Sequence, residues 1–205
     1  MNQLMSALER SGLYEQLTND LTEEQSRRLS EFLELRAQWS HTHNLSGPRA
    51  LTLLSTDIAD AVAVWLCTNM SRPLVDIGSG SGVPGLMVAC LAPELQVHLV
   101  EPLAKRCAFM KTVAHKLGLK SVKVHRGRWP NIGTELDGVI SISRAVVSPE
   151  EWPLLADQPR VFGVMQMLAH HRPQWPLDHY DLVQSVNYID PEGGSRVVHR
   201  WEKSL

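Results

Sequence analysis

A cluster of glycines between two apolar stretches is the feature of this sequence that most directly suggests ligand binding. Residues 74–90 read LVDIGSGSGVPGLMVAC, and GSGVPG at 80–85 has the G-x-G-x-x-G spacing of dinucleotide-binding turns. Glycine is costly at the end of a strand unless the backbone turns tightly or approaches a ligand closely. The spacing alone leaves three interpretations open: a phosphate site, an adenosyl site, or a tight turn without a ligand.

Two acidic residues narrow these interpretations. Asp76 stands two residues before Gly78, where the pyrophosphate of a dinucleotide would lie, and a carboxylate there would repel it. The same carboxylate would attract the ammonium group of a methionine moiety, directly or through water. Glu101 follows about 20 residues after the glycines, in the place of the acid that binds ribose hydroxyls in nucleotide folds. We therefore predict S-adenosylmethionine, rather than NAD, as the ligand. Its predicted contacts in this region are Asp76, Gly78, Gly80, Gly82, Val83 and Glu101.

The composition is typical of a soluble globular protein, with 43% hydrophobic and 20% charged residues. No stretch reaches the roughly 18 apolar residues of a membrane span. The first residues, MNQLMSALER, carry charge too early for a signal peptide. Three scattered cysteines without a Cys-x-x-Cys motif predict neither a disulfide framework nor a zinc site. We expect a cytoplasmic protein without a metal.

The formal net charge of −2 hides a strong asymmetry along the chain. Residues 102–128 contain eight Lys or Arg and no acid, so the other residues hold 12 basic and 22 acidic side chains. Such a block is either an ordinary solvated face or a binding surface for an anionic polymer.

The first 70 residues predict helices. Thr22 and Gln25 have the spacing of a capping box at the start of EEQSRRLSEFLELRAQW. The segment NLSGP at 44–48 ends this helix, and Pro48 is placed to start another. We expect residues 1–70 to form a helical segment packed on a domain of residues 71–205, with both parts in one structural unit.

From residue 73 onward, apolar strands alternate with helices. The expected strands are 74–78, 97–101, 121–127, 136–145 and about 160–167, and the expected helices are 85–92, 103–118 and 148–155. A hairpin of 180–189 and 195–203, around DPEGG, closes the chain. The alternation predicts a parallel sheet with helices on both faces. With the closing hairpin, it indicates an α/β, Rossmann-like methyltransferase fold with a mostly parallel seven-stranded sheet.

Several stretches resemble one family, the bacterial small-subunit rRNA guanine-N7 methyltransferases, also called RsmG or glucose-inhibited division protein B. WSHTHNLS at 39–46 is similar to the family's W-N-x-x-x-N-L-T, and VDIGSGSGVPGL to its V-D-[IV]-G-[ST]-G-x-G-x-P-G. EPLAKRCAFM at 101–110 resembles [DE]-S-x-x-K-[KR]-x-x-F-L, and ISRA at 142–145 resembles S/A-R-A. The glycine motif is common among methyltransferases, whereas the Asn-Leu-Ser segment and the Lys-Arg pair are specific to the family.

The resemblance implies transfer of a methyl group from S-adenosylmethionine to N7 of a guanine in 16S rRNA, either free or in the small ribosomal subunit. It places Arg128, Trp129, Pro130 and Arg144 at the cofactor. It assigns RNA contacts to Asn44 and Arg128, and the basic block adds Lys105 and Arg106 as further candidates for RNA contacts. Because guanine N7 has a free lone pair, the reaction needs positioning rather than a general base. Asn44 and Arg144 are the candidates for that positioning. Two other roles stay open: Asn44 could cap its helix, and Arg144 could tie down the hairpin.

The sequence also departs from the family at three places. Pro130 stands where the family has a glutamate beside the adenine, so adenine recognition would rest on the backbone and on Trp129. The family's lysine in A-L-K-G is replaced by Gln166, and no histidine precedes Asp57 as in H-x-x-D-S. These departures leave open a relative that binds cofactor or RNA without catalysis. A methyltransferase for a small molecule or a protein is a third possibility, which the helical N-terminal segment and the basic block disfavour.

Overall fold

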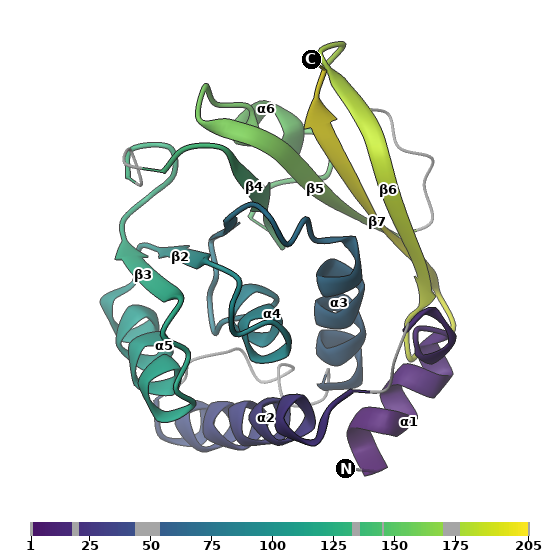
Figure 1. The fold of residues 1–205 in the computed structure, drawn as a ribbon. Coiled ribbons are helices and arrows are strands. Elements are labelled where there is room, and N and C mark those ends of the chain that lie inside the picture. Colours follow the sequence, from purple (N-terminus) through teal and green to yellow (C-terminus); the bar gives the residue numbers. More distant parts are fainter. Residues whose placement is uncertain are drawn as a thin grey trace.

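Seven strands form one mixed sheet among the residues that the computed structural model describes, which are 2–17, 21–43, 54–132, 136–144, 146–169 and 177–204. Their order across the sheet is β3-β2-β1-β4-β5-β7-β6 (Figure 1). The strands are β1 (Leu74–Ile77), β2 (Val97–Glu101), β3 (Val122–Arg126), β4 (Val139–Ile142), β5 (Val161–Ala169), β6 (Tyr180–Ile189) and β7 (Ser195–Lys203). The first five are parallel, and β7 lies antiparallel between β5 and β6. The predicted fold class is confirmed.

The helices cover the two faces of the sheet unequally. They are α1 (Asn2–Ser11), the 3-10 turn η1 (Tyr14–Gln16), α2 (Glu23–His43), α3 (Leu54–Cys67), α4 (Gly85–Leu91), α5 (Ala104–Lys116) and α6 (Trp152–Ala156). Figure 1 shows α2, α3, α4 and α5 on one side of the sheet and α6 on the other. None of the helices in the described ranges is long and apolar enough to cross a membrane.

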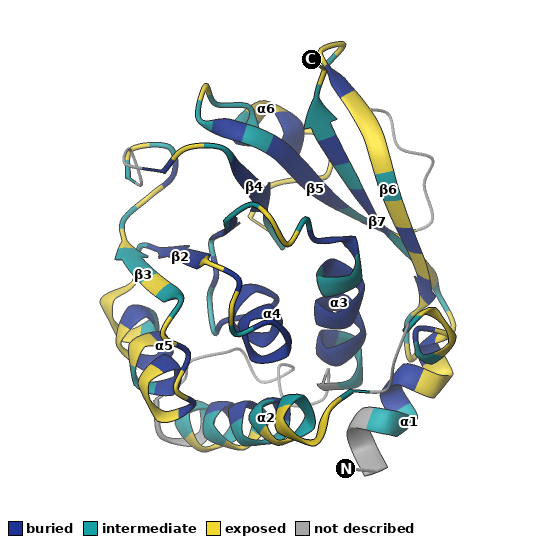
Figure 2. Cartoon of the chain, in the orientation of Figure 1, coloured by how far each residue is buried: buried dark blue, intermediate teal, exposed yellow. Residues whose placement is uncertain are grey.

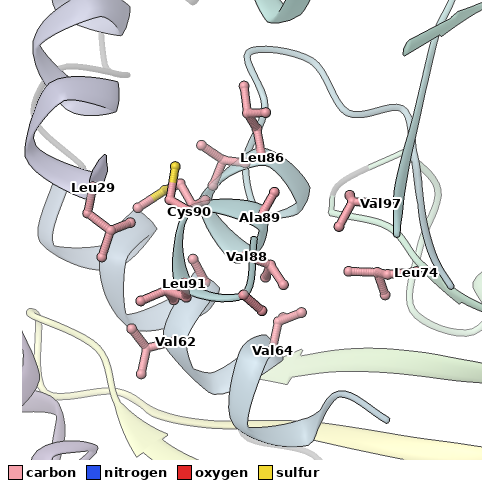
Figure 3. Packing of buried hydrophobic residues seen from close by; sticks show 14 of the residues in the cluster. Leu29, Val62, Val64, Leu74, Leu86, Val88, Ala89, Cys90, Leu91 and Val97 are labelled. Carbon is pink, nitrogen blue, oxygen red and sulfur yellow. The ribbon is translucent and has the colours of Figure 1, made fainter. Parts of the chain in front are cut away.

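Alternating strand residues build a separate core on each face, as the two-residue period of a strand requires. Leu74 of β1 belongs to the larger core, together with residues of α1 to α5, whereas Val75 and Ile77 belong to the smaller core beneath α6. Helix α4 is buried along its whole length, as its uniform dark colour shows in Figure 2. Figure 3 shows its residues Leu86 to Leu91 surrounded by side chains of α2, α3, β1 and β2.

The N-terminal helical segment shares this larger core and starts α2 as the sequence predicts. Thr22 Oγ1 accepts a hydrogen bond from the Gln25 N–H at 3.2 Å, and Gln25 Oε1 accepts one from the Thr22 N–H at 2.9 Å. Gln25 also donates through Nε2 to the carbonyl of Leu91 at 2.6 Å, which ties α2 to α4. The predicted capping box is therefore confirmed. The predicted helix start at Pro48 lies outside the described residues.

The fourth strand is shorter than the predicted range of 136–145. It begins at Val139, because Gly138 has φ +62° and turns the chain just before it. It ends at Ile142, because the next residue, Ser143, leaves the ladder and donates through Oγ to the carbonyl of Ile77 at 2.9 Å. This early end places Arg144 outside the sheet, at the edge where the parallel strands finish.

Candidate active site

A cavity of about 930 Å³ lies at the carboxyl ends of β1, β2, β3 and β4. We call it the first cavity. The chain crosses from β1 to β2 in one direction and reaches β4 on the other side of β1, so β1 and β4 flank the switch point of the sheet. Open α/β sheets bind ligands at this point. The cavity has the size of a small-molecule or cofactor site.

The glycine turn forms one wall of the first cavity. Gly78 donates to the carbonyl of Val100 at 2.8 Å, and the turn continues through Gly80 with φ +57°. A Cβ on Gly80 would meet no atom closer than 3.8 Å, so a side chain there would project into open space beside the cavity. Gly82 serves a different purpose, because a Cβ there would lie 2.8 Å from Leu86 and 3.4 Å from Phe32. Gly82 allows close packing, and it does not line the first cavity.

Asp76 lies behind the glycine turn rather than in the cavity wall. Its side chain is fully buried, and Oδ2 accepts a hydrogen bond from the N–H of Gly85 at 3.0 Å. Burial raises the pKa of Asp76 to about 7, although the hydrogen bond from Gly85 and the charge of Arg144 act in the opposite direction. The structure therefore gives Asp76 a contact to the start of α4. Its predicted contact with the ammonium group of a ligand stays a prediction.

Glu101 lines the first cavity with a fixed carboxylate. Its Oε2 accepts from the N–H of Gly80 at 3.0 Å, and its Oε1 accepts from the N–H of Leu103 at 2.9 Å. Arg106 Nη1 lies 3.7 Å from Oε2. Each carboxylate oxygen has two lone pairs, so both can accept a further hydrogen bond. The geometry suits a pair of ribose hydroxyls.

Trp129 and Arg128 line the side of the first cavity near β3. The Trp129 ring is held by a hydrogen bond from Nε1 to the carbonyl of Leu155 at 3.2 Å, and the guanidinium of Arg160 stacks 4.4 Å from its centroid. Pro130 does not line the cavity, and its carbonyl accepts a hydrogen bond from Arg160. Trp129 thus forms a rigid apolar wall of the cavity. Pro130 lies outside the wall and contacts Arg160, the residue that stacks on Trp129.

Arg144 belongs to a network of buried charges at the other side of the first cavity. Its Nη1 lies 2.6 Å from Asp57 Oδ1 and 3.1 Å from Asp60 Oδ2. Asp57 Oδ2 lies 2.5 Å from Nη1 of Arg36, which also donates to Ser81 Oγ. Arg36 and both carboxylates are buried, and Arg36 lines the first cavity. We call Arg36, Asp57, Asp60 and Arg144 the buried charge network.

The C-terminal hairpin is attached to this network. Tyr188 donates through its hydroxyl to Asp60 Oδ1 at 2.7 Å, and Arg196 Nη1 lies 4.0 Å from the same oxygen. Arg196 is itself fixed by Asp190, with Nε 2.9 Å from Oδ2. Arg144 therefore reaches the hairpin through Asp60 while also lining the first cavity. The geometry is compatible with a role at the cofactor and with a role in tying down the hairpin.

A second cavity of about 400 Å³ lies beside the first, and Arg144 and Val147 line both. Its walls come from α3, β5, α6 and the hairpin. They include Asp60, Trp152, Gln166, Tyr188 and Arg196. Gln166 is almost fully buried and donates through Nε2 to the carbonyl of Pro149 at 3.0 Å, so it anchors the loop after β4.

The residues predicted to bind RNA are only partly brought together. Lys105 and Arg106 lie in the first turn of α5, where Lys105 is exposed and Arg106 lines the first cavity. Arg128 lies on the same cavity, beside Trp129. Asn44 lies outside the described residues.

Among the cavity-lining residues that sequence reasoning did not assign to the site, four belong to the buried charge network or to the part of the hairpin attached to it. They are Arg36, Asp60, Tyr188 and Arg196. Two of them carried a signal in the sequence. Arg36 falls on the apolar side of its helix, and Asp60 stands in the apolar run DIADAVAVWL. A charge in an apolar stripe predicts a buried partner. The hairpin residues carried no such signal, because their proximity arises only from the long-range pairing of β5 with β7.

The site and the fold together define a class of protein. An open sheet with β7 inserted antiparallel between β5 and β6, and with a glycine turn and an acidic residue lining the cavity at its switch point, is the architecture of S-adenosylmethionine-dependent methyltransferases. The solved structure of P. horikoshii TYW2 in complex with MeSAdo superimposes with a TM-score of 0.53 at 13% identity, covering 71% of this chain and 61% of that one. This likeness is one of fold.

Comparison of sequences gives the family. Residues 25–175 match the family GidB, described as rRNA small subunit methyltransferase G, and the chain belongs to this family. The ribosomal RNA small subunit methyltransferase G of Helicobacter pylori (strain HPAG1) is 34% identical over 120 residues, or 58% of this chain and 67% of that protein. The protein of the same name from Nitrosomonas europaea is 37% identical over 131 residues, or 63% of this chain and 60% of that protein. The matched part thus spans about two thirds or less of these relatives. The resemblance inferred from the motifs is confirmed.

The residues present fit S-adenosylmethionine, the cofactor of this family. The open space in front of Gly80 leaves the turn free for close approach, and the Glu101 carboxylate faces the same cavity. When bound, the cofactor supplies an electrophilic methyl group on a sulfonium. In the described part of the chain, no group of three or more His, Cys, Asp or Glu side chains has an arrangement that could hold a metal ion.

Proposed function

We propose that this protein transfers a methyl group from S-adenosylmethionine to N7 of a guanine in 16S rRNA, acting in the cytoplasm. The observation that carries the proposal is the contact between the two cavities at Arg144 and Val147. A donor in the first cavity and a nucleobase in the second would meet at these residues. Family membership supports rRNA as the substrate.

The chemistry of the cavity walls agrees with attack by a lone pair that needs no deprotonation. The carboxylates of Glu101 and Asp60 already accept hydrogen bonds from backbone N–H groups, or from Tyr188 and Arg144. They are therefore suited to fixing ligands and neighbouring side chains rather than to abstracting a proton. The proposed catalysis consists of alignment of the attacking nitrogen with the donor, which supplies rate through position and orientation.

The test is methylation of small-subunit rRNA, offered both as naked RNA and in assembled small subunits, with isotope-labelled S-adenosylmethionine. Mass analysis of the digested nucleosides should detect labelled 7-methylguanosine. A different labelled nucleoside would contradict the N7 assignment. Donor binding without labelling of any RNA would instead favour a relative that binds without catalysis, the alternative that Gln166 and Pro130 suggest.

Two matched glycine variants show whether the activity comes from the first cavity. Gly80→Val places a side chain at the cavity, whereas Gly118→Val places one in open space at the end of α5, about 20 Å along that helix. Both glycines have positive φ, +57° and +67°, so both variants carry comparable backbone strain. Gly80→Val should lose donor binding and methylation, and Gly118→Val should retain both. Equal losses in the two variants would show that strain, not the site, is responsible.

A further inference from the structure

Two exposed valines stand where the cavities meet. Val146 and Val147 follow β4 and are 44% and 36% exposed, although most large apolar side chains of the described chain are buried. Val147 lines both cavities, and Val146 packs on the glycine turn so closely that a Cβ on Gly78 would clash with its Cγ2. We call Val146 and Val147 the valine pair.

The segment that follows the valine pair is firmly held. Ser148 and Glu151 form a capping box, with Glu151 Oε2 accepting from the Ser148 N–H at 3.2 Å and Ser148 Oγ accepting from the Glu151 N–H at 3.3 Å. Gln166 anchors the carbonyl of Pro149 through its side-chain amide. The valine pair therefore directly precedes an anchored segment, and exposed apolar side chains beside a cavity are suited to contact with a ligand.

Charges around the valine pair indicate the kind of ligand. Arg144 borders both cavities, and Arg196 lines the second, each held in place by a buried or partly buried carboxylate. Arg106 adds a cation to the wall of the first cavity, and the exposed Lys105 precedes it in the first turn of α5. Asp60, Asp190 and Glu192 also line the second cavity, so it offers hydrogen-bond donors and acceptors beside an apolar contact. This combination suits a nucleobase, which has an apolar face and polar edges.

Resting on the proposed function, we propose that the valine pair is the surface against which the face of the target guanine packs, with Val147 as its principal contact. Enzymes that modify a base commonly act on a single-stranded or extruded nucleotide, and contacts in the protein then replace the lost stacking. Val147 can replace it from the junction of the cavities, where the base must lie to meet the donor.

The test compares four proteins: wild type, Val147→Ala, Val147→Ile, and Val183→Ala as a control. Val183 is 47% exposed on β6 and lines neither cavity. In Val147→Ala, kcat/KM for small-subunit rRNA should fall roughly three- to tenfold, the effect of removing two partly buried methyl groups. Donor Kd should not change, nor should the dependence of RNA binding on salt, because no phosphate contact is removed. Val147→Ile, which keeps both methyl groups, should lose less kcat/KM than Val147→Ala, and Val183→Ala should match wild type.

Three results would overturn the proposal. One is a Val147→Ala protein with wild-type kcat/KM for the RNA. Another is a donor Kd raised as much as kcat/KM is lowered, which would make Val147 part of the cofactor wall. The third is an equal loss in Val183→Ala. These results presuppose an active wild type. If the wild-type protein does not methylate rRNA, it is the proposed function itself that fails, and the inference fails with it.

Discussion

At the scale of single residues, Asp76 and Glu101 look alike in the sequence but differ in surroundings. Each is an acid at or near the end of a buried strand, and the sequence assigns both to the cofactor. Glu101 ends β2 and reaches the first cavity, whereas Asp76 comes one residue before the end of β1 and points to Gly85 of α4. Both side chains face the larger core, because Asp76 pairs with Leu99 and Glu101 lies two residues beyond Leu99 on the same side of β2. Asp76 is therefore set back by two residues from the edge where Glu101 lies, and this register between the two strands cannot be read from the sequence.

The burial of Asp76 leads to a prediction for stability against pH. Its pKa of about 7 in the folded protein exceeds the value of about 3.9 expected for the unfolded chain. Between these values the folded state holds a proton that the unfolded state has released, so the free energy of unfolding contributed by Asp76 falls as pH rises from about 4 to 7. Asp76→Asn removes this contribution. Urea denaturation without ligand should show the variant gaining stability relative to wild type from pH 5 to pH 8.

Asp181→Asn, which neutralises an exposed carboxylate on β6, is the control for that comparison. Its stability relative to wild type should be nearly constant over the same pH range. A constant difference for Asp76→Asn as well would mean that Asp76 stays ionised in the folded protein.

At the scale of elements, α5 has an unusual first turn. It contains Lys105 and Arg106 and no acid, although cations are unfavourable beside the positive end of a helix dipole. The basic block is evident in the sequence, but its position relative to the cofactor site depends on how β2 and α5 join. Because Glu101 ends β2 and α5 begins three residues later, Arg106 lines the first cavity and the exposed Lys105 stands next to it in the chain.

This placement predicts how RNA binding depends on salt. Lys105→Ala combined with Arg106→Ala should weaken binding of small-subunit rRNA and lower the slope of log K against log salt by about 0.7 to 0.9 for each RNA phosphate that these side chains neutralise. Donor affinity should change little, although Arg106 lies 3.7 Å from Glu101. The control is Lys116→Ala with Lys120→Ala, which removes the same charge at the other end of α5. If both pairs lowered the slope equally, RNA binding would depend on the overall positive charge of the basic block and not on direct phosphate contacts of Lys105 and Arg106.

At the scale of the whole molecule, the sequence was sufficient for the alternation of strands and helices and for the hairpin, because both follow from local periodicity and turn residues. The buried charge network could not be predicted in this way. Arg36 and Asp57 are 21 positions apart in the sequence, and Asp60 and Tyr188 are 128 apart. Their contacts arise only when α2, α3, the end of β4 and the hairpin pack together. The network thus joins the N-terminal helices to the last strands across the active site.

Removing one charge from the centre of this network should affect the stability of the whole chain. Asp57 is 1% exposed and lies between Arg36 and Arg144, so Asp57→Asn leaves two arginines without their shared anion. Removing one partner of a buried ion pair lowers the free energy of unfolding by about 3–5 kcal/mol. This is a large fraction of the roughly 5–15 kcal/mol that typically stabilises a domain. Urea denaturation at pH 7 should show a loss of this size. Glu24→Gln breaks the pairs of the solvent-exposed Glu24 carboxylate to Arg27 and Arg28 and should cost far less stability, because water and salt screen this charge. If Asp57→Asn cost no more than Glu24→Gln, the buried charge network would not hold the N-terminal helices to the site.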